Sequence, residues 1–318
     1  MKMAPLMFSR RDFGRVAFLP VSTMLAKRID SAFHGVQFGL QSYIFSGIGL
    51  PHDGILDLVI KSMVECGLGE CDLFAPLVEP APLWERIRAG VPARPGEQVT
   101  AQAAAARAQA REELAKWRMT VSLDHFRAIR NKFDAAGIAI HGLSAFPGST
   151  IEELTRTYDI AEVLGARIVT LGVTFPAAKL VAPVAEKRDF IVGIQGQPDL
   201  SITDPDVVSK PGQYDKALSL SRSYRISIDI GDATGGGYDS LAFVKDRLDR
   251  IAVIYLKDRR KDRVSVPWGE GDTPIKEILR LVRDSKFPIR CYIDCDYKTT
   301  DRPTDVKRSF GYAKAALA

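Results

Sequence analysis

The chain has 318 residues, of which 46% are hydrophobic and 26% charged, enough apolar material for one large core or two ordinary ones. This composition excludes a disordered chain and a small fold held together by disulfides. Lys and Arg outnumber Asp and Glu by 44 to 39, but residues 1–28 alone carry a net charge of +5, and the remainder has 38 residues of each sign. No basic groove is expected in that neutral remainder, which argues against nucleic acid as a partner.

The N-terminal residues 1–30 have the pattern of an export signal. Residues 9–13 (SRRDF) resemble the twin-arginine motif, and residues 16–26 (VAFLPVSTMLA) supply a short apolar stretch behind it. Eleven apolar residues are too few to cross a bilayer as a helix, so no stable membrane insertion is expected. We predict a periplasmic protein, with an amphipathic N-terminal helix on a cytoplasmic enzyme as the alternative.

From residue 35 onward, short β-rich runs alternate with longer helical patterns, and no linker interrupts them. The predicted strands are residues 36–44, 69–75, 138–146, 166–172, 189–196, 224–231, 250–258 and 289–297. The predicted helices are residues 52–66, one long helix within 99–136, then 150–164, 175–187, 213–223, 239–248, 273–284 and 304–317.

Eight βα units of about 36 residues each predict a single-domain α/β protein with the (β/α)8 TIM-barrel fold. The barrel spans residues 35–318, and a Pro- and Arg-rich insertion, residues 76–98, follows the second strand. A doubly wound open sheet is the competing fold. It would carry a Gly-rich phosphate loop after the first strand, and since none is present we expect no nucleotide cofactor.

The four cysteines are interpreted as buried apolar residues. Cys66 and Cys71 lack the spacing of a zinc knuckle, and Cys291 and Cys295 share one face of the last strand. A disulfide remains the alternative.

Alternation along the strands predicts which side chains enter the barrel. The polar residues that share the inward parity are Asp72, His141, Gln195, Gln197, Ser227, Asp229, Tyr255, Lys257, Tyr292, Asp294 and Asp296. In a TIM barrel the active site lies at the carboxyl ends of the strands. A mouth lined by acidic, hydroxyl and amide groups suits a small-molecule sugar, because each substrate hydroxyl needs a donor and an acceptor.

Several segments carry a resemblance to a known family. They read LDHFRAIRNKFDAAGI (123–138), AEVLGARIVTLG (161–172), IDIGDATGGGYD (228–239), YLKDRRK (255–261), VPWGEGDTPIKEIL (266–279) and IDCDY (293–297). Together they resemble the xylose-isomerase-like sugar phosphate isomerase/epimerase family, over essentially all of the chain after residue 35. The resemblance implies the same TIM barrel and a divalent metal ion at its mouth.

The resemblance also implies where such a metal would bind. The family places a Glu or His at the end of the fifth strand, an Asp on the sixth, a His on the seventh and a Glu on the eighth. The matching positions here are Gln195, Asp229, Tyr255 and Asp294, of which only Asp229 is unchanged.

With Asp232 added, the candidate ligands are Asp229, Asp232, Asp294 and Gln195. This oxygen-only set favours Mg, Mn or Ca over Zn. Loss of the metal is the alternative, because each change from Glu to Asp draws a carboxylate back by one methylene.

These residues suggest an isomerase or epimerase that abstracts a proton next to a carbonyl of a sugar or keto-sugar. Asp294 and Asp296 are the candidate bases, and Lys257 is the candidate electrophile or, alternatively, only the partner of a salt bridge with Asp229 or Asp258. The candidate substrate-binding residues are Asp72, His141, Gln197, Tyr255 and Trp268. The alternatives are an exported lyase or hydrolase that acts on keto-glycosides, and a sugar-binding barrel without activity. Assembly as a homo-oligomer is left open.

Overall fold

The computed structural model describes residues 26–46, 52–90, 99–146 and 148–318. The predicted twin-arginine motif at residues 9–13 lies outside these ranges. Among the helices in these ranges, none combines the length and the apolar character that a membrane crossing requires.

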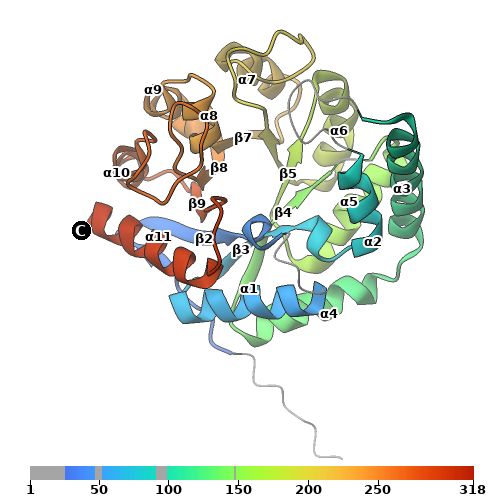
Figure 1. Ribbon diagram of the computed structural model, residues 1–318, viewed down its shortest axis with the longest axis horizontal. Helices are drawn as coiled ribbons and strands as arrows, with labels where there is room; N and C mark the ends of the chain where they lie inside the picture. The colour runs from blue at the N-terminus through green and yellow to red at the C-terminus, as the bar shows by residue number, and fades with distance from the viewer. Residues whose placement is uncertain (1–25, 47–51, 91–98, 147) are drawn as a thin grey trace, which may run out of the picture.

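Eight parallel strands close into a barrel, which confirms the predicted fold (Figure 1). They are β2 (Val36–Gln41), β3 (Glu70–Phe74), β4 (Ala139–Ala145), β5 (Ile168–Gly172), β6 (Ile191–Gln195), β7 (Tyr224–Asp229), β8 (Ile251–Leu256) and β9 (Arg290–Ile293). Pairing of β2 with β9, from Gln37 opposite Arg290 to Leu40 opposite Ile293, completes the cylinder. A short strand, β1 (Ala32–Phe33), pairs antiparallel to β2 ahead of the barrel.

Helices surround the barrel on its outer side (Figure 1). They are α1 (His52–Cys66), α2 (Ala81–Ala89), α3 (Ala101–Thr120), α4 (Leu123–Ala135), α5 (Ile151–Leu164), α6 (Phe175–Arg188), α7 (Pro211–Leu218), α8 (Ile230–Gly235), α9 (Ser240–Lys245), α10 (Ile275–Ser285) and α11 (Arg302–Leu317). The insertion after the second barrel strand contains α2.

The long helix predicted within residues 99–136 is two helices, α3 and α4. The break occurs because Val121 adopts an extended conformation and the Ser122 side chain accepts a hydrogen bond from the Asp124 N–H, which caps α4. The predicted sixth strand is also shorter than expected, because the Asp229 side chain accepts a hydrogen bond from the Asp232 N–H and begins α8.

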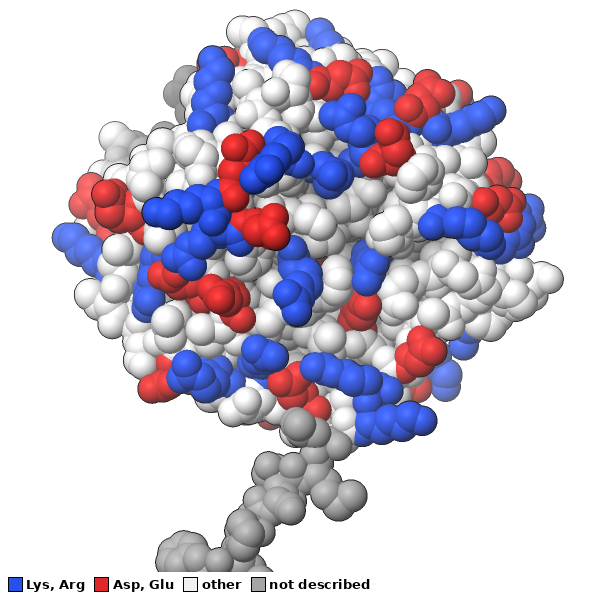
Figure 2. All heavy atoms as spheres, turned by 180° about the vertical axis from the view of Figure 1, so that it is seen from behind, with Lys and Arg blue, Asp and Glu red and all other residues white. Residues whose placement is uncertain are grey.

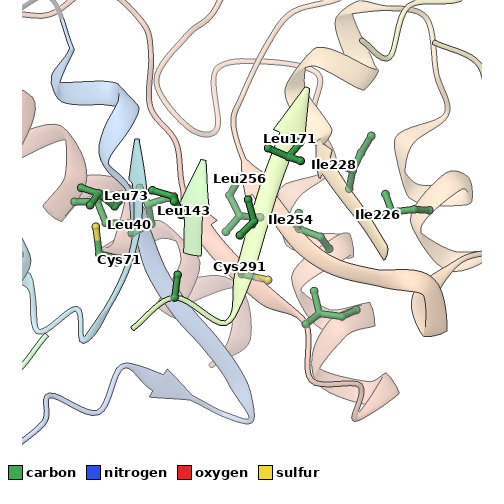
Figure 3. Close-up of a cluster of buried hydrophobic side chains, with 14 of the residues drawn as sticks. Leu40, Cys71, Leu73, Leu143, Leu171, Ile226, Ile228, Ile254, Leu256 and Cys291 are labelled. Atoms are coloured by element: carbon green, nitrogen blue, oxygen red, sulfur yellow. The ribbon is translucent and has the colours of Figure 1, made fainter. Parts of the chain in front are cut away.

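The main core lies between the barrel and the helices, on the outward face of the strands. Figure 3 shows part of it, with Leu73, Ile226, Ile254 and Cys291 among the labelled side chains. All four cysteines are free thiols, as the apolar interpretation predicted, although Cys66 is only half-buried. The position of this core confirms that the apolar side chains of the strands point outward from the barrel, as the alternation predicts.

The inside of the barrel combines aromatic packing with buried polar groups. Tyr255 and Tyr292 stack with ring centroids 6.2 Å apart. The Tyr255 hydroxyl donates to Asp72 Oδ2 at 2.6 Å, and the Ser144 hydroxyl donates to the same oxygen at 3.0 Å. Burial raises the pKa of Asp72 to about 6, against these hydrogen bonds, which favour its ionised form.

The raised pKa of Asp72 predicts a pH-dependent stability. Because the folded value lies above the ordinary 3.8, the stability that Asp72 contributes is present below that pH and is lost as pH rises through about 6. We expect the free energy of unfolding of Asp72→Asn, relative to that of wild type, to increase by up to about 3 kcal/mol from about pH 4 to about pH 8. Urea unfolding at both pH values measures this gain, with the exposed Asp246→Asn as control. A difference from wild type that does not change with pH would contradict the prediction.

Candidate functional site

The ammonium group of Lys257, which follows β8, lies among four aspartates at the carboxyl end of the barrel. Its Nζ atom is 2.8 Å from Asp229 Oδ2, 3.0 Å from Asp296 Oδ2, 3.6 Å from Asp294 Oδ2 and 3.8 Å from Asp232 Oδ1. These residues belong to the end of β7, the start of α8 and the segment after β9. The strand ends therefore bring together residues that are far apart in sequence.

Arg259 supplies a second positive charge beside the same aspartates. Its Nη2 atom is 3.0 Å from Asp232 Oδ1 and 3.2 Å from Asp296 Oδ2. We call this group the aspartate–lysine cluster, and it consists of Asp229, Asp232, Lys257, Arg259, Asp294 and Asp296. With four carboxylates and two cations, its formal charge is −2 when all groups are ionised.

The cluster has a buried part and a part that solvent reaches. The side chains of Asp229, Asp294 and Lys257 are 4%, 6% and 6% exposed. Asp296 and Asp232 are 18% and 36% exposed, and the Arg259 guanidinium lies beside them. A substrate that approaches the mouth can therefore contact these last three residues.

The surroundings separate the pKa values of the aspartates. Burial, together with the other three aspartates and against the attraction of Lys257, raises the pKa of Asp294 to about 8. Burial opposes the ionisation of Asp296 too, but Lys257 and a hydrogen bond from Ser265 outweigh it and lower the pKa of Asp296. Asp294 therefore holds a proton at neutral pH, whereas Asp296 is ionised.

The other two buried members of the cluster are also shifted. Burial and the nearby Asp232 raise the pKa of Asp229 to about 6. Burial lowers the pKa of Lys257, yet the four aspartates, Asp229 foremost, outweigh it and raise that pKa well above its ordinary value of 10.5. Lys257 is therefore a permanent cation at any physiological pH.

Two local features hold Lys257 in place. Gly231 lies against it, and a Cβ atom at that position would come within 2.9 Å of the Lys257 Cβ, so a larger residue would displace the lysine. The next residue, Asp258, accepts hydrogen bonds from the N–H groups of Gly269, Gly271 and Thr273 at 2.7, 3.1 and 3.2 Å. The WGEGDT stretch therefore anchors the chain directly after Lys257.

The candidate metal ligands do not fit a metal ion in this arrangement. Asp229, Asp232 and Asp294 all face the Lys257 ammonium, which occupies the position where a shared cation would bind. Gln195 ends β6, and its side chain is half-buried. In the ranges that the structure describes, no group of three or more His, Cys, Asp or Glu side chains is arranged to hold a metal ion.

The predicted substrate-binding residues are not all at the mouth. Gln197 is, because it lines a cavity of about 240 Å³ together with Asp232 and Arg259. Asp72 and Tyr255 are bonded to each other inside the barrel.

His141 and Trp268 lie elsewhere. His141 is near the start of β4, where its Nδ1 atom is 3.2 Å from the Tyr292 hydroxyl and it lines a different cavity with Arg290. Burial, helped by Arg290 and Arg167, lowers its pKa to about 4. Trp268 is buried edge-on against Tyr312 of α11, so it packs the loop that holds Asp258.

Two features of the mouth were missed from the sequence. Arg259 lies only two residues after Lys257, in the YLKDRRK segment. Tyr43, just after β2, is 43% exposed and so partly buried, and it contacts Phe74 edge-on at a centroid distance of 5.1 Å. Burial raises the pKa of Tyr43, Lys257 opposes this rise, and Asp294 adds to it. The phenol therefore lies within the electric field of the cluster. The predicted strand of residues 36–44 included Tyr43, whereas β2 ends at Gln41, so the sequence did not mark this residue as part of the mouth.

Comparison with solved structures identifies the chain's fold as that of the xylose isomerase-like TIM barrel proteins, in agreement with the resemblance read from the sequence. No family model and no curated relative matches the sequence.

Three solved structures illustrate the likeness. A sugar phosphate isomerase/epimerase from Parabacteroides distasonis is 14% identical, with a TM-score of 0.56 over 92% of this chain and 99% of that one. A probable 3-DHS dehydratase from Bacillus anthracis is 10% identical, with a TM-score of 0.60 over 87% and 98%. A xylose isomerase domain protein from Planctomyces limnophilus is 13% identical, with a TM-score of 0.58 over 88% and 97%.

Proposed function

We propose that the chain is an enzyme that abstracts a proton next to a carbonyl of a sugar or keto-sugar, as sugar isomerases and epimerases do. The observation that carries this proposal is the pairing of an ionised, partly exposed Asp296 with Arg259 at the barrel mouth. A carboxylate that stays ionised can accept a proton, and a guanidinium beside it can bind an oxygen that becomes negative.

In the proposed step, Asp296 accepts the proton from the carbon next to the carbonyl. The C–H electron pair forms a carbon–carbon double bond, and the carbonyl π electrons move to the oxygen, giving an enediolate. Arg259 donates hydrogen bonds to that oxygen, since it is the cation of the cluster that also reaches the cavity beside Gln197. The isomer forms when Asp296 gives the proton to the former carbonyl carbon while the proton of the adjacent hydroxyl moves to the enediolate oxygen. The epimer forms when a proton from solvent reaches the opposite face of the original carbon and Asp296 releases the first proton to solvent.

The wider surroundings suit a polyhydroxy substrate. Asp232 and Gln197 offer acceptors and donors for hydroxyl groups beside the cluster. The partly exposed ring of Tyr43, within the field of the cluster, offers an apolar face for the C–H groups of a sugar. Sugar isomerases and epimerases among the solved structures of this fold support the same substrate class.

The test is exchange of substrate hydrogen with solvent. We expect the wild-type protein in D₂O to incorporate deuterium at the carbon next to the carbonyl of at least one keto-sugar in a panel that also includes keto-glycosides. Mass spectrometry of the recovered sugars measures it. The matching sugar alcohols, which have no carbonyl, should show no exchange.

The other outcomes distinguish the alternatives. Release of the aglycone from a keto-glycoside would favour the lyase or hydrolase. Measurable sugar binding without any exchange across the panel would overturn the proposal in favour of a barrel that only binds sugar.

A further inference from the structure

The aspartate–lysine cluster has the form of a cation site whose cation is part of the chain. Carboxylate oxygens from β7, α8 and the end of β9 converge on a single position, and the Lys257 Nζ atom fills it at distances of 2.8 to 3.8 Å. The stem of the lysine reaches this position past Gly231, where the absence of a side chain leaves room.

This position requires a positive charge. Asp229 is buried, Asp296 lies beside it in the cluster, and both are ionised at neutral pH, where carboxylates that leave water without a partner are strongly unfavourable. Arg259 is paired with Asp232 and Asp296 on the outer side, so Lys257 is the cation that the cluster places directly beside Asp229 and Asp294.

We propose that the Lys257 ammonium is the resident cation of this site and takes the place of the divalent metal ion that the resemblance implies. Lys257 is a positioning residue, because it acts through the carboxylates that it holds, Asp296 among them. The inference rests on the proposed function in one respect, namely that Asp296 is the base of the proposed reaction.

The proposal has a consequence for the site without the ammonium. In the structure the buried Oδ1 atoms of Asp294 and Asp296 have no hydrogen-bond partner. Lys257→Ala would in addition free the Oδ2 atoms of Asp229, Asp294 and Asp296 that the ammonium now faces. A set of carboxylate oxygens prefers a hard divalent cation such as Mn²⁺. A single substitution should therefore convert the lysine site into a metal site.

The experiment titrates Mn²⁺ into the full-length protein and follows free Mn²⁺ by electron paramagnetic resonance. We expect the wild type and Lys257→Gln, which fills the same space with a neutral amide, to leave Mn²⁺ free. Lys257→Ala should bind one equivalent. Its Tm should rise by about 5 °C when Mn²⁺ exceeds its Kd by about 100-fold. Lys257→Ala/Asp229→Asn, which lacks one ligand, should lose that binding.

Stoichiometric Mn²⁺ on the wild type at this site, abolished in Asp229→Asn, would overturn the proposal. A Lys257→Ala protein that binds no Mn²⁺, or that stays unfolded both with and without Mn²⁺, would also overturn the proposal. A Lys257→Ala protein that folds only in the presence of Mn²⁺ would support it. Because binding and not turnover is measured, a wild type without deuterium exchange would sink the proposed function and leave this result standing.

Discussion

Lys257→Met should lower the free energy of unfolding by about 3–5 kcal/mol at neutral pH, the usual cost of breaking a buried ion pair by removing one partner. Met fills nearly the same volume, so the loss comes from the charge and not from a cavity. The buried and ionised Asp229 would remain without its nearest cation.

The loss should also depend on pH. The pKa values of Asp229 and Asp294 are already raised, to about 6 and about 8, and would rise further without the ammonium. A raised carboxyl pKa gives stability that is present below the ordinary value and is lost as pH rises through the folded value. The difference between wild type and Lys257→Met should therefore widen as pH rises above about 6, where Asp229 is ionised in the wild type but still protonated in the variant.

Urea unfolding at several pH values measures that difference. The control is Lys245→Met, which removes an exposed lysine at the end of α9 and should change stability little at any pH. A deficit of the same size across the whole range would show that Lys257 contributes through packing alone.

Asp296→Asn should reduce deuterium exchange by about 10²- to 10⁴-fold, the usual cost of losing a general base. Asp294→Asn should cost much less, about tenfold or below at neutral pH, because an amide resembles the protonated carboxyl that its raised pKa predicts. The initial rate of exchange into the keto-sugar that the wild type labels best measures both effects.

Asp246→Asn makes the same chemical change at an exposed position outside the cluster and should leave the exchange rate unchanged. If Asp294→Asn were the more damaging of the two cluster variants, the base would have to be reassigned to Asp294.

The fold could be predicted from the sequence because the barrel repeats one simple pattern. Apolar residues such as Ile226 and Ile254 alternate with polar ones, and each strand is followed by a helical period. The same alternation, together with their places at the strand ends, predicted that Asp229, Lys257, Asp294 and Asp296 lie at one end of the barrel. In the structure the three aspartates surround the lysine there.

The sequence did not specify how far along a strand a side chain lies, or which distant residues pack together. His141 has the inward parity, but it is the third residue of β4 and so lies toward the opposite end of the barrel. Trp268 packs against Tyr312, a contact across 44 positions that no local pattern specifies. The break before α4 had a signal, since Ser122 is a good cap, but the Ala-rich run before it favoured one continuous helix.

The ammonium of Lys257 is joined to the barrel by covalent bonds, and this sets its occupancy. A dissociable ion fills its site to a degree that varies with its concentration and with competing ions. The lysine is present in every molecule at a stoichiometry of one, whatever the ionic composition outside. Its raised pKa keeps it charged even in alkaline surroundings. The electrostatics of the mouth are therefore fixed when the chain folds and do not depend on later loading.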